Sequence, residues 1–370
     1  MAIDEVISGL EGVLACESSI CCIDGLAGKL EYRGYDIHEL AGRVSFEQIA
    51  FLLWEGRLPS QTQSESFAQE LADLRQPDPR AIEALRLLPT DAHPMATFRA
   101  AVGMLAAADP EQEAEGREAN LQKAKRMTAQ FSTLVAAQAR IAAGEPLLAP
   151  QPGLSHAADY LRMLQGKEAE PEAVQALDMV LVIYAEHELN ASTFTARVVT
   201  GTLSDAYSAI IGAIGALKGP LHGGAIDDVQ RVLMEVGSAD RVTAFLDEAL
   251  AAKRKIPGFG HRVYRVLDPR AVHLQRMAER LAAAKGDTRW YDVAMEMQRQ
   301  IKERKSLNAN VDYYAAPVLY YLGFPLKLFT NVIASTRIVG WMAHVLEQYD
   351  NNRLIRPRAR YSGEHDRRIA

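Results

Sequence analysis

The sequence predicts a mostly helical protein, and three features of the chain lead to this prediction. Alanine is abundant, runs of β-branched residues are short, and apolar residues recur at spacings of three and four along most of the 370 residues. Hydrophobic residues make up 48% of the chain, which is enough for a substantial core. A chain of this length predicts two domains, or one large domain with a smaller one attached.

The N-terminal region is the exception to the helical pattern. Residues 21–37, CCIDGLAGKLEYRGYDI, have Gly25 and Gly28 between short apolar stretches. Short apolar runs separated by a turn that contains glycine are typical of a β-hairpin. We therefore expect one small hairpin ahead of the helices.

The first long helix has clear signals at both of its ends. Ser45 is followed three residues later by Gln48, which is the spacing of a capping box. Apolar residues continue through Leu53, and Gly56 together with Pro59 should end the helix.

Proline-containing and acidic segments predict the breaks between the helices that follow. Proline in a helix interior removes a hydrogen bond and clashes with the preceding turn. The expected breaks are residues 77–80, 88–94, 109–118 and 145–153. The helical pattern resumes after the last of these, so it is not assigned as a domain boundary.

Two apolar helices are expected next. The first covers residues 172–186 and places His187 at or near its end. The second covers residues 204–217, with Ser204 as its N-cap and the Gly-Pro pair after it as a stop.

The second of these helices contains the small residues Gly212 and Gly215. Glycine weakens a helix interior by up to about 1 kcal/mol, but small residues on one face permit close approach of another helix. Two interpretations stay open: a packing helix at a subunit interface, and an ordinary buried core helix.

Composition and charge exclude several classes of protein. The formal net charge is −6 and no basic stripe stands out, so we expect no nucleic-acid partner. No window holds the ~18 uninterrupted apolar residues of a membrane-spanning helix. The N-terminus MAIDEVISGLEG has acidic residues where a signal peptide needs basic ones. We expect a soluble, cytoplasmic protein without a membrane partner.

The three cysteines do not form a recognisable site. Cys16, Cys21 and Cys22 lack CxxC spacing and have no histidine nearby, so neither a zinc site nor a disulfide framework is predicted. We expect buried or partly buried free thiols in a reducing compartment.

Three short segments in the C-terminal half carry residues suited to catalysis. In the first, GPLHGGA, glycines flank His222 and would let a substrate approach the ring and the backbone N–H groups. A simple turn that happens to contain a histidine is the alternative.

The second segment is GHRVYRVLDPRA. His261 follows a glycine-rich turn, Asp268 is expected as an N-cap, and Pro269 fits the first position of a helix. Arg270 would then lie in the first turn, where a cation opposes the helix dipole. A bound anion would explain that placement, and a solvated arginine beside a turn histidine is the alternative.

The third segment, NVDYYAAP, places Asp312 between a loop and a helix. Partial burial beside Val311 and Tyr313 would raise the pKa of the carboxyl group toward that of a general base. The alternative is that Asp312 only caps the helix.

Several kinds of site are not predicted. HELNASTFTARV has Ala191 where a zincin helix needs its second histidine, and no P-loop occurs in the chain. GFGHRV lacks the third glycine of a dinucleotide fingerprint, and no histidines and carboxylates have metal-ligand spacing. We expect no metal and no resident cofactor.

Together these segments resemble the citrate synthase family, in the shorter form found in bacteria and archaea. The similarity extends almost end to end, from GLEGVLACESSI through LWEGRLP to NRLIRPRARY, with GPLHGGA, PGFGHRVYRVLDPRA and NVDYY in this order.

The resemblance implies an all-α fold with a large and a small helical domain. Residues 1–222 and 319–370 would form the large domain, and residues 223–318 the small one. Closure of the small domain over the large one would exclude water from the site.

The resemblance also implies a role for each residue. Asp312 would remove a methyl proton from acetyl-CoA, His222 would stabilise the enol, and His261 would polarise the ketone of oxaloacetate. The oxaloacetate ligands would be His187, His261, Arg270, Arg337 and, from the partner subunit of a homodimer, Arg356. The coenzyme A ligands would be Lys255, Ile256, Pro257, Gly258, Phe259, Gly260, Arg265 and Asn310.

Three other interpretations of the sequence remain as alternatives. A 2-methylcitrate synthase would run the same reaction on propionyl-CoA, and one methyl group supports only ~1–3 kcal/mol of discrimination. A metal-dependent hydrolase would need a ligand cluster that the sequence lacks. A catalytically silent helical protein would have no use for His222, His261 and Asp312.

Overall fold

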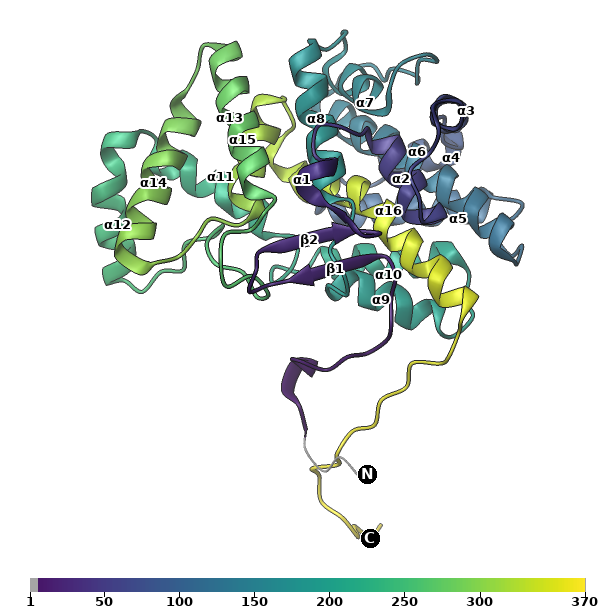
Figure 1. Ribbon diagram of the computed structural model, residues 1–370. Coiled ribbons are helices and arrows are strands. Elements are labelled where there is room, and N and C mark those ends of the chain that lie inside the picture. The colour runs from purple at the N-terminus through teal and green to yellow at the C-terminus, as the bar shows by residue number, and fades with distance from the viewer. Residues whose placement is uncertain (1–5, 370) are drawn as a thin grey trace.

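The computed structural model describes residues 6–369, which fold into helices and one small antiparallel sheet (Figure 1). The predicted all-α class is confirmed. The α-helices are α1 (Ile37–Leu40), α2 (Phe46–Glu55), α3 (Gln61–Asp73), α4 (Pro79–Leu87), α5 (Pro94–Ala108), α6 (Arg117–Ala143), α7 (His156–Gln165), α8 (Pro171–Tyr184), α9 (Ala191–Thr200), α10 (Ala206–Leu217), α11 (Ala225–Val236), α12 (Val242–Ala251), α13 (Ala271–Lys285), α14 (Arg289–Lys305), α15 (Val311–Tyr321) and α16 (Phe329–Asp350). Short 3-10 turns lie at Ser8–Leu10, Ala239–Arg241 and Leu326–Leu328.

The predicted hairpin is present. Strand β1 (Cys21–Asp24) pairs antiparallel with β2 (Lys29–Tyr32), and a third short strand, β3 (Tyr35–Asp36), extends the sheet. The sequence pattern did not predict β3. The tip of the hairpin packs closely against a distant loop. A Cβ atom on Gly25 would lie only 2.3 Å from the carbonyl oxygen of Val263 in that loop.

The capping box of α2 is also confirmed. The Gln48 N–H donates to Oγ of Ser45 over 3.3 Å, and the Ser45 N–H donates to the Gln48 side chain over 2.9 Å. Gly56 ends the helix with a φ of 76°, in the left-handed region that glycine adopts without strain.

Two helix boundaries differ from the predictions. Helix α8 ends at Tyr184, so His187 lies beyond the helix and not within its last turn. The N-cap of α10 is Asp205, not Ser204, because the Asp205 carboxylate accepts from the Ser208 N–H over 3.0 Å. The Ser204 carbonyl accepts from the Tyr349 hydroxyl.

Helix α10 packs on α9 through its small residues. A Cβ atom on Gly212 would lie 3.3 Å from the Val199 side chain and 3.4 Å from that of Thr195. The glycine therefore permits the close approach that the sequence predicted.

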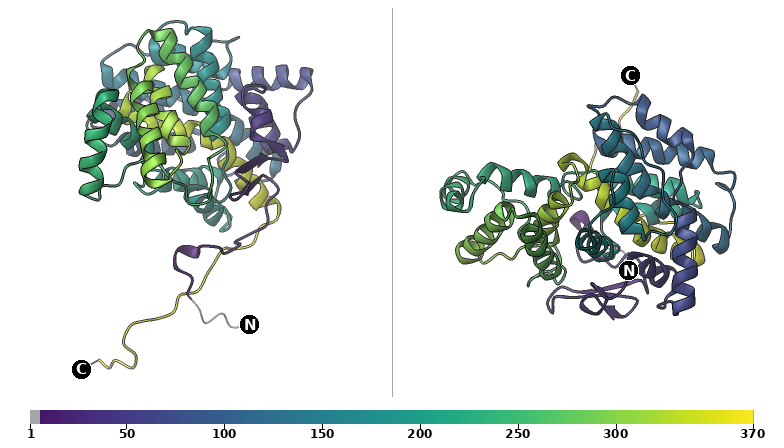
Figure 2. Two further views of the ribbon diagram at one scale, coloured as in Figure 1. Left: turned by 60° about the vertical axis from the view of Figure 1, so that its left-hand side comes forward. Right: turned by 90° about the horizontal axis from the view of Figure 1, so that it is seen from above.

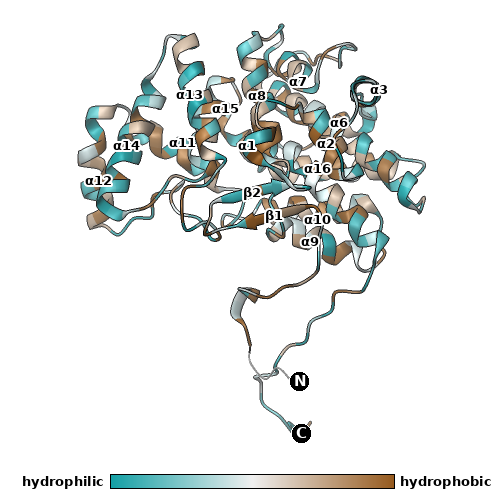
Figure 3. Cartoon of the chain, viewed as in Figure 1, coloured by the Kyte–Doolittle hydropathy of each residue, from teal (hydrophilic) through white to brown (hydrophobic). Residues whose placement is uncertain are grey.

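Helix α16 is the centre of the larger group of helices, and it contacts α2, α5, α6, α8, α9 and α10. Nearly every residue from Phe329 to Leu346 is buried, whereas α3 and much of α14 present the polar residues drawn in teal in Figure 3. A helix buried on all sides needs no polar face.

Helices α11–α14 form a second group beside the first, and α15 adjoins both (Figures 1 and 2). Contacts of α13 and α15 with α8, and of α11 with α16, connect the two groups. The described parts of the segments before β1 and after α16, which begin at residue 6 and end at residue 369, extend away from the helices on the same side (Figure 1).

The cysteines are free thiols, as expected. Cys16 and Cys21 are partly buried, but Cys22 is exposed, which corrects the expectation that all three are at least partly buried. On a β-strand, successive side chains point to opposite faces, so the neighbours Cys21 and Cys22 cannot share one environment.

None of the helices in residues 6–369 is both long and apolar enough to cross a bilayer.

Candidate active site

His222 lies in the turn between α10 and α11, and its geometry fixes its tautomer. The backbone N–H of Ser192 donates to Nε2 over 3.3 Å, and Ser192 Oγ lies 2.8 Å from the same atom. Because Nε2 accepts a hydrogen bond, the neutral ring carries its proton on Nδ1. Burial, together with the charge of Arg337, lowers the pKa of His222 to about 4. The ring is therefore an uncharged donor at neutral pH.

The glycine after His222 is required by the packing of this turn. A Cβ atom on Gly223 would lie 2.4 Å from the carbonyl oxygen of Leu217, and the Gly223 N–H donates to that oxygen over 3.0 Å. Only glycine permits this close approach of the two backbones.

His261 has the opposite tautomer. Its Nδ1 accepts from the N–H groups of Val263 over 3.0 Å and Tyr264 over 3.2 Å, so the proton of the neutral ring lies on Nε2. Burial and the nearby guanidinium of Arg270 lower the pKa of His261 to about 4.

His187 is buried beside His261, with the ring centroids 5.3 Å apart. Its Nε2 lies 3.3 Å from the hydroxyl of Tyr264. Burial, and then the charge of Arg270, lower the pKa of His187 well below its ordinary value. This third ring is also uncharged.

Arg270 and Asp268 form a buried ion pair, and the helix that follows begins later than predicted. Helix α13 begins at Ala271, and Asp268 is not its N-cap, nor Pro269 its first residue. The Asp268 carboxylate accepts from the backbone N–H of Arg270 over 3.0 Å, and also from Nε over 3.0 Å and Nη2 over 2.8 Å of the same residue. The two bonds from the guanidinium form a bidentate, charge-assisted pair. Within residues 6–369, Nη1 of Arg270 has no hydrogen-bond partner.

Arg337 lies on α16 and is 5% exposed. Its Nε donates to the carbonyl oxygen of Tyr184 over 2.8 Å, and its two Nη atoms have no hydrogen-bond partner among the described residues. Burial lowers the pKa of the guanidinium, although the group stays charged at neutral pH. A buried cation with unpaired N–H groups needs an anion for full compensation.

Asp312 lies in the first turn of α15. It is not the N-cap, because Asn310 holds that position and accepts from the Asp312 N–H over 3.1 Å. The Oδ1 atom accepts from the hydroxyl of Tyr184 over 2.8 Å, and Oδ2 has no partner in the described part of the chain. Burial raises the pKa of Asp312, in opposition to the hydrogen bond from Tyr184 and the charge of Arg270.

Electrostatic contacts join these residues into one site. His187 lies within electrostatic reach of Arg270, Arg337, His261 and His222, and burial together with the two guanidinium charges lowers its pKa. The charges of Arg270 and Arg337 also lower the pKa of Asp312, in opposition to burial. The fold therefore brings together three neutral imidazoles, two guanidiniums and one carboxylate from five different segments, because His261 and Arg270 lie on the same loop before α13.

The segment predicted to bind coenzyme A lies beside Asp312. Gly258 accepts from the Asn310 N–H and Gly260 donates to Asn308, both over 2.9 Å. The Asn310 side chain donates to Gly260 over 3.0 Å. Gly258 has a φ of 84°, and a Cβ atom there would lie 2.7 Å from the Tyr313 ring.

Three predicted ligands have exposed side chains. The side chains of Lys255 and Arg265 are exposed. Arg356 is also exposed, in the segment that extends away after α16 (Figure 1).

The sequence analysis missed the residues that position the catalytic groups. Asn190 is the N-cap of α9, and Ser192 lies in the first turn of that helix. The sequence pattern did not identify Tyr184, Tyr264 or Trp341, whose indole N–H donates to Ser192 Oγ over 3.1 Å. No sequence signal distinguishes these aromatic residues from ordinary core residues.

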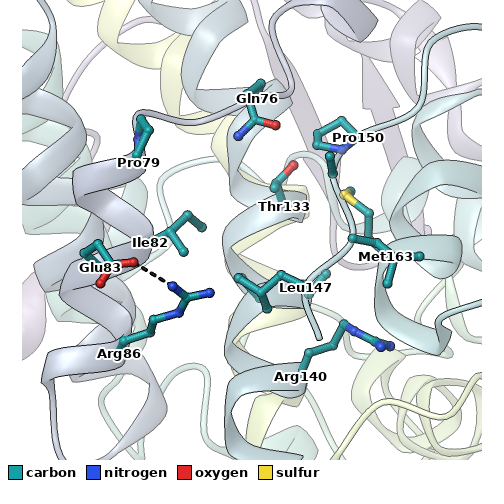
Figure 4. A pocket seen from close by; sticks show the side chains of 14 residues that line it. Gln76, Pro79, Ile82, Glu83, Arg86, Thr133, Arg140, Leu147, Pro150 and Met163 are labelled. Atoms are coloured by element: carbon teal, nitrogen blue, oxygen red, sulfur yellow. Dashed lines mark hydrogen bonds and ion pairs between the residues drawn. The ribbon is translucent and has the colours of Figure 1, made fainter. Parts of the chain in front are cut away.

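A pocket of about 330 Å³ lies elsewhere, between α4, α6 and residues 147–150 (Figure 4). Arg86 and Arg140 line it, but each is paired with a glutamate, Glu83 over 2.7 Å and Glu145 over 3.0 Å. It contains none of the predicted site residues.

No group of three or more histidine, cysteine, aspartate or glutamate side chains in residues 6–369 is arranged to hold a metal ion.

Residues 9–358 match the family model described as citrate synthase, C-terminal domain. The chain is 46% identical over 367 residues to a citrate synthase of Haloferax volcanii, with 98% of this chain and 97% of the relative covered. It is 40% identical over 365 residues to a 2-methylcitrate synthase of Mycobacterium tuberculosis, with 99% and 92% covered.

Solved structures agree with these sequence matches. Citrate synthase from Thermotoga maritima superposes with a TM-score of 0.88 at 39% identity, over 99% of this chain and 98% of that one. Citrate synthase from Thermoplasma acidophilum, solved with carboxymethyl coenzyme A and oxaloacetate, superposes with a TM-score of 0.92 at 32% identity, over 99% and 98%.

Proposed function

The chain belongs to the citrate synthase family and is an acyltransferase that converts an acyl group into an alkyl group on transfer, and we propose that it condenses acetyl-CoA with oxaloacetate and water to citrate and coenzyme A. One observation carries the proposal. The Asp312 carboxylate, with one oxygen free of hydrogen bonds, lies in the same cluster as two neutral histidines of opposite tautomer and two guanidiniums with unpaired N–H groups.

The first step is removal of a methyl proton from the thioester. Oδ2 of Asp312 takes the proton, and the electrons of the C–H bond move onto the thioester oxygen. The Nδ1–H of His222 donates a hydrogen bond to that oxygen. A positioned donor of this kind is worth a few kcal/mol where negative charge develops, about 2.7–4 kcal/mol in comparable oxyanion sites.

The second step joins the enolate carbon to the ketone carbon of oxaloacetate. The Nε2–H of His261 polarises the ketone oxygen and supplies its proton as the alkoxide forms. Arg270 and Arg337 bind the carboxylates through their unpaired N–H groups, beside His187. Hydrolysis of the citryl thioester then releases citrate and the coenzyme A thiol.

The proposal includes a homodimer in which Arg356 of one subunit completes the oxaloacetate site of the other. Its support is the exposure of apolar side chains on the two extended terminal segments, among them Leu14 at 93% and Leu354 at 58%. Apolar surface of this kind is normally covered by a partner.

The proposal also includes two domains, with residues 223–318 as the small one. His222 and Asp312 lie close to its two boundaries, so closure would bring the enol donor and the base onto the substrate. Lys255, Ile256, Pro257, Gly258, Phe259, Gly260, Arg265 and Asn310 are proposed to bind coenzyme A.

The alternative is a 2-methylcitrate synthase that uses propionyl-CoA, and the similarity to the Mycobacterium tuberculosis protein of that name favours it. We also propose that the protein is a cytoplasmic enzyme of the tricarboxylic acid cycle and that it has no resident cofactor or metal.

Thiol release from acetyl-CoA and from propionyl-CoA, each with oxaloacetate and a chelator, distinguishes the two activities. We expect kcat/KM to favour acetyl-CoA. A preference for propionyl-CoA would establish the alternative, and absence of thiol release from both would refute the proposed activity.

A further inference from the structure

Tyr184 connects the two halves of the site. It is the last residue of α8 and is 2% exposed. Its hydroxyl donates to Oδ1 of Asp312 over 2.8 Å, and its carbonyl oxygen accepts from Nε of Arg337 over 2.8 Å. One residue therefore contacts both the proposed base and a proposed oxaloacetate ligand.

We propose that Tyr184 is a positioning residue that holds the Asp312 carboxylate with one oxygen tied and the other aimed at the substrate. This inference rests on the proposed function. It assigns a role in proton abstraction to a residue that acts through the base, because its hydroxyl donates to the Asp312 carboxylate.

The hydrogen bond selects which oxygen acts. Within residues 6–369, the Tyr184 hydroxyl and the Asp312 carboxylate bond only through Oδ1, so Oδ2 keeps its lone pairs for the incoming proton. The Asn310 side chain accepts from the Asp312 N–H and fixes the start of α15, and the phenol then fixes the rotation of the carboxylate. A base must be held within hydrogen-bond reach of the proton that it removes.

The charges around the pair keep the proton on the phenol. Burial raises the pKa of Tyr184 well above its ordinary value, and the neighbouring Asp312 charge raises it further. The same hydrogen bond opposes the effect of burial on Asp312, whose pKa is nevertheless raised. Tyr184 therefore stays a donor, and its hydrogen bond favours the ionised form of the carboxylate.

The contact also crosses the proposed domain boundary. Tyr184 belongs to the proposed large domain and Asp312 to residues 223–318. An opening of the two domains would break this bond, so the carboxylate would be oriented for proton removal only in the closed arrangement.

The test compares Tyr184→Phe with wild type and with Tyr160→Phe. Tyr160 is equally buried, and its hydroxyl lies 3.3 Å from Ser335, away from the residues of the site, so it controls for loss of a buried phenol hydroxyl. Steady-state kinetics are measured with the preferred acyl-CoA across a range of pH.

Loss of the donor should lower kcat and move the acid limb of the kcat profile to higher pH, because the pKa of Asp312 rises without its hydrogen bond. The oxaloacetate KM should change little, since the carbonyl that binds Arg337 remains. We expect kcat to fall by about tenfold, less than the roughly 10²–10⁴ that a positioned acid–base group contributes, because Asp312 itself remains. Tyr160→Phe should leave both kcat and the acid limb unchanged.

An unchanged kcat and an unchanged acid limb in Tyr184→Phe would overturn the inference. Equal losses in Tyr184→Phe and Tyr160→Phe would overturn it as well, because they would indicate a general loss of stability. Tyr184→Gln, which keeps a neutral N–H donor, should recover part of kcat and of the original acid limb.

If the proposed function is wrong, the wild-type protein itself releases no thiol, and this result is distinct from a failure of the Tyr184 inference. The Tyr184 inference is then tested by carbon-13 NMR titration of the Asp312 carboxyl group, assigned with Asp312→Asn. A higher pKa in Tyr184→Phe than in wild type supports it, and an equal pKa refutes it.

Discussion

The backbone N–H of Ser192 donates to Nε2 of His222 over 3.3 Å, across 30 residues of sequence. A backbone N–H cannot accept, so this contact makes Nε2 the acceptor and directs the remaining Nδ1–H away from it. Ser192 Oγ, which accepts from Trp341, lies 2.8 Å from the same nitrogen. Helix α9 thus determines how His222 presents its proton.

Ser192→Ala should lower kcat by about tenfold, since His222 keeps the backbone contact but loses the hydroxyl that orients its ring. Thiol-release kinetics measure the effect. Ser208→Ala, which removes a hydroxyl from the first turn of α10, is the matched control and should keep wild-type kcat. Equal kcat values in Ser192→Ala and wild type would contradict the proposed role of the hydroxyl.

Arg337→Lys should raise the oxaloacetate KM by at least about 30-fold, the equivalent of about 2 kcal/mol for an impaired buried charge contact. Lysine keeps the positive charge but cannot donate to the Tyr184 carbonyl and to a carboxylate with the geometry of a guanidinium. Arg86→Lys, at the separate pocket of Figure 4, is the control. A KM that stays near the wild-type value would exclude Arg337 from the oxaloacetate site.

Acid should destabilise the protein through its buried histidines. The pKa of His222 and of His261 is about 4 in the folded chain, against an ordinary value of 6.5. Between these values the unfolded chain binds more protons than the folded one, so the free energy of unfolding falls as pH decreases from about 6.5 toward 4.

Thermal unfolding measured at several pH values between 7 and 4 tests this prediction. His273, whose pKa is also about 4 because of burial and the nearby His38, should contribute to the same slope. His273→Gln should therefore flatten the dependence of Tm on pH, and a Tm that does not vary across this range would be inconsistent with neutral buried rings.

Arg356 provides a test of the shared site. Arg356→Gln and Asp312→Asn should each be almost inactive alone. In a mixed dimer, one of the two sites would combine the intact Arg356 of one subunit with the intact Asp312 of the other. Co-expression should therefore restore part of the activity, and its absence in an isolated mixed dimer would show that each subunit supplies its own Arg356.

Local signals in the sequence predicted local structure well. The hairpin of β1 and β2 and the capping box at Ser45 depend on residues a few positions apart, and both were found. The predicted helix start at Pro269 was wrong, because α13 begins at Ala271, and the Asp268 carboxylate also binds the guanidinium of Arg270 and the N–H of Val311. That second partner lies 43 residues away.

The site itself could be predicted only in part. His222, His261 and Asp312 stand in unusual segments that the family resemblance identified. Tyr184 could not be found in this way, because its contact with Asp312 spans 128 residues and a tyrosine in an apolar helix resembles any core residue. Tautomers also require three-dimensional contacts, since the sequence does not specify which ring nitrogen accepts a hydrogen bond.

The measurement that most directly tests the account is the turnover of Asp312→Asn, together with oxaloacetate binding by calorimetry. Asparagine keeps the shape of the side chain but cannot take the methyl proton. We predict that kcat falls by at least about 100-fold while the oxaloacetate Kd stays within about twofold of wild type. A variant that turns over at the wild-type rate would contradict the central claim that Asp312 is the base.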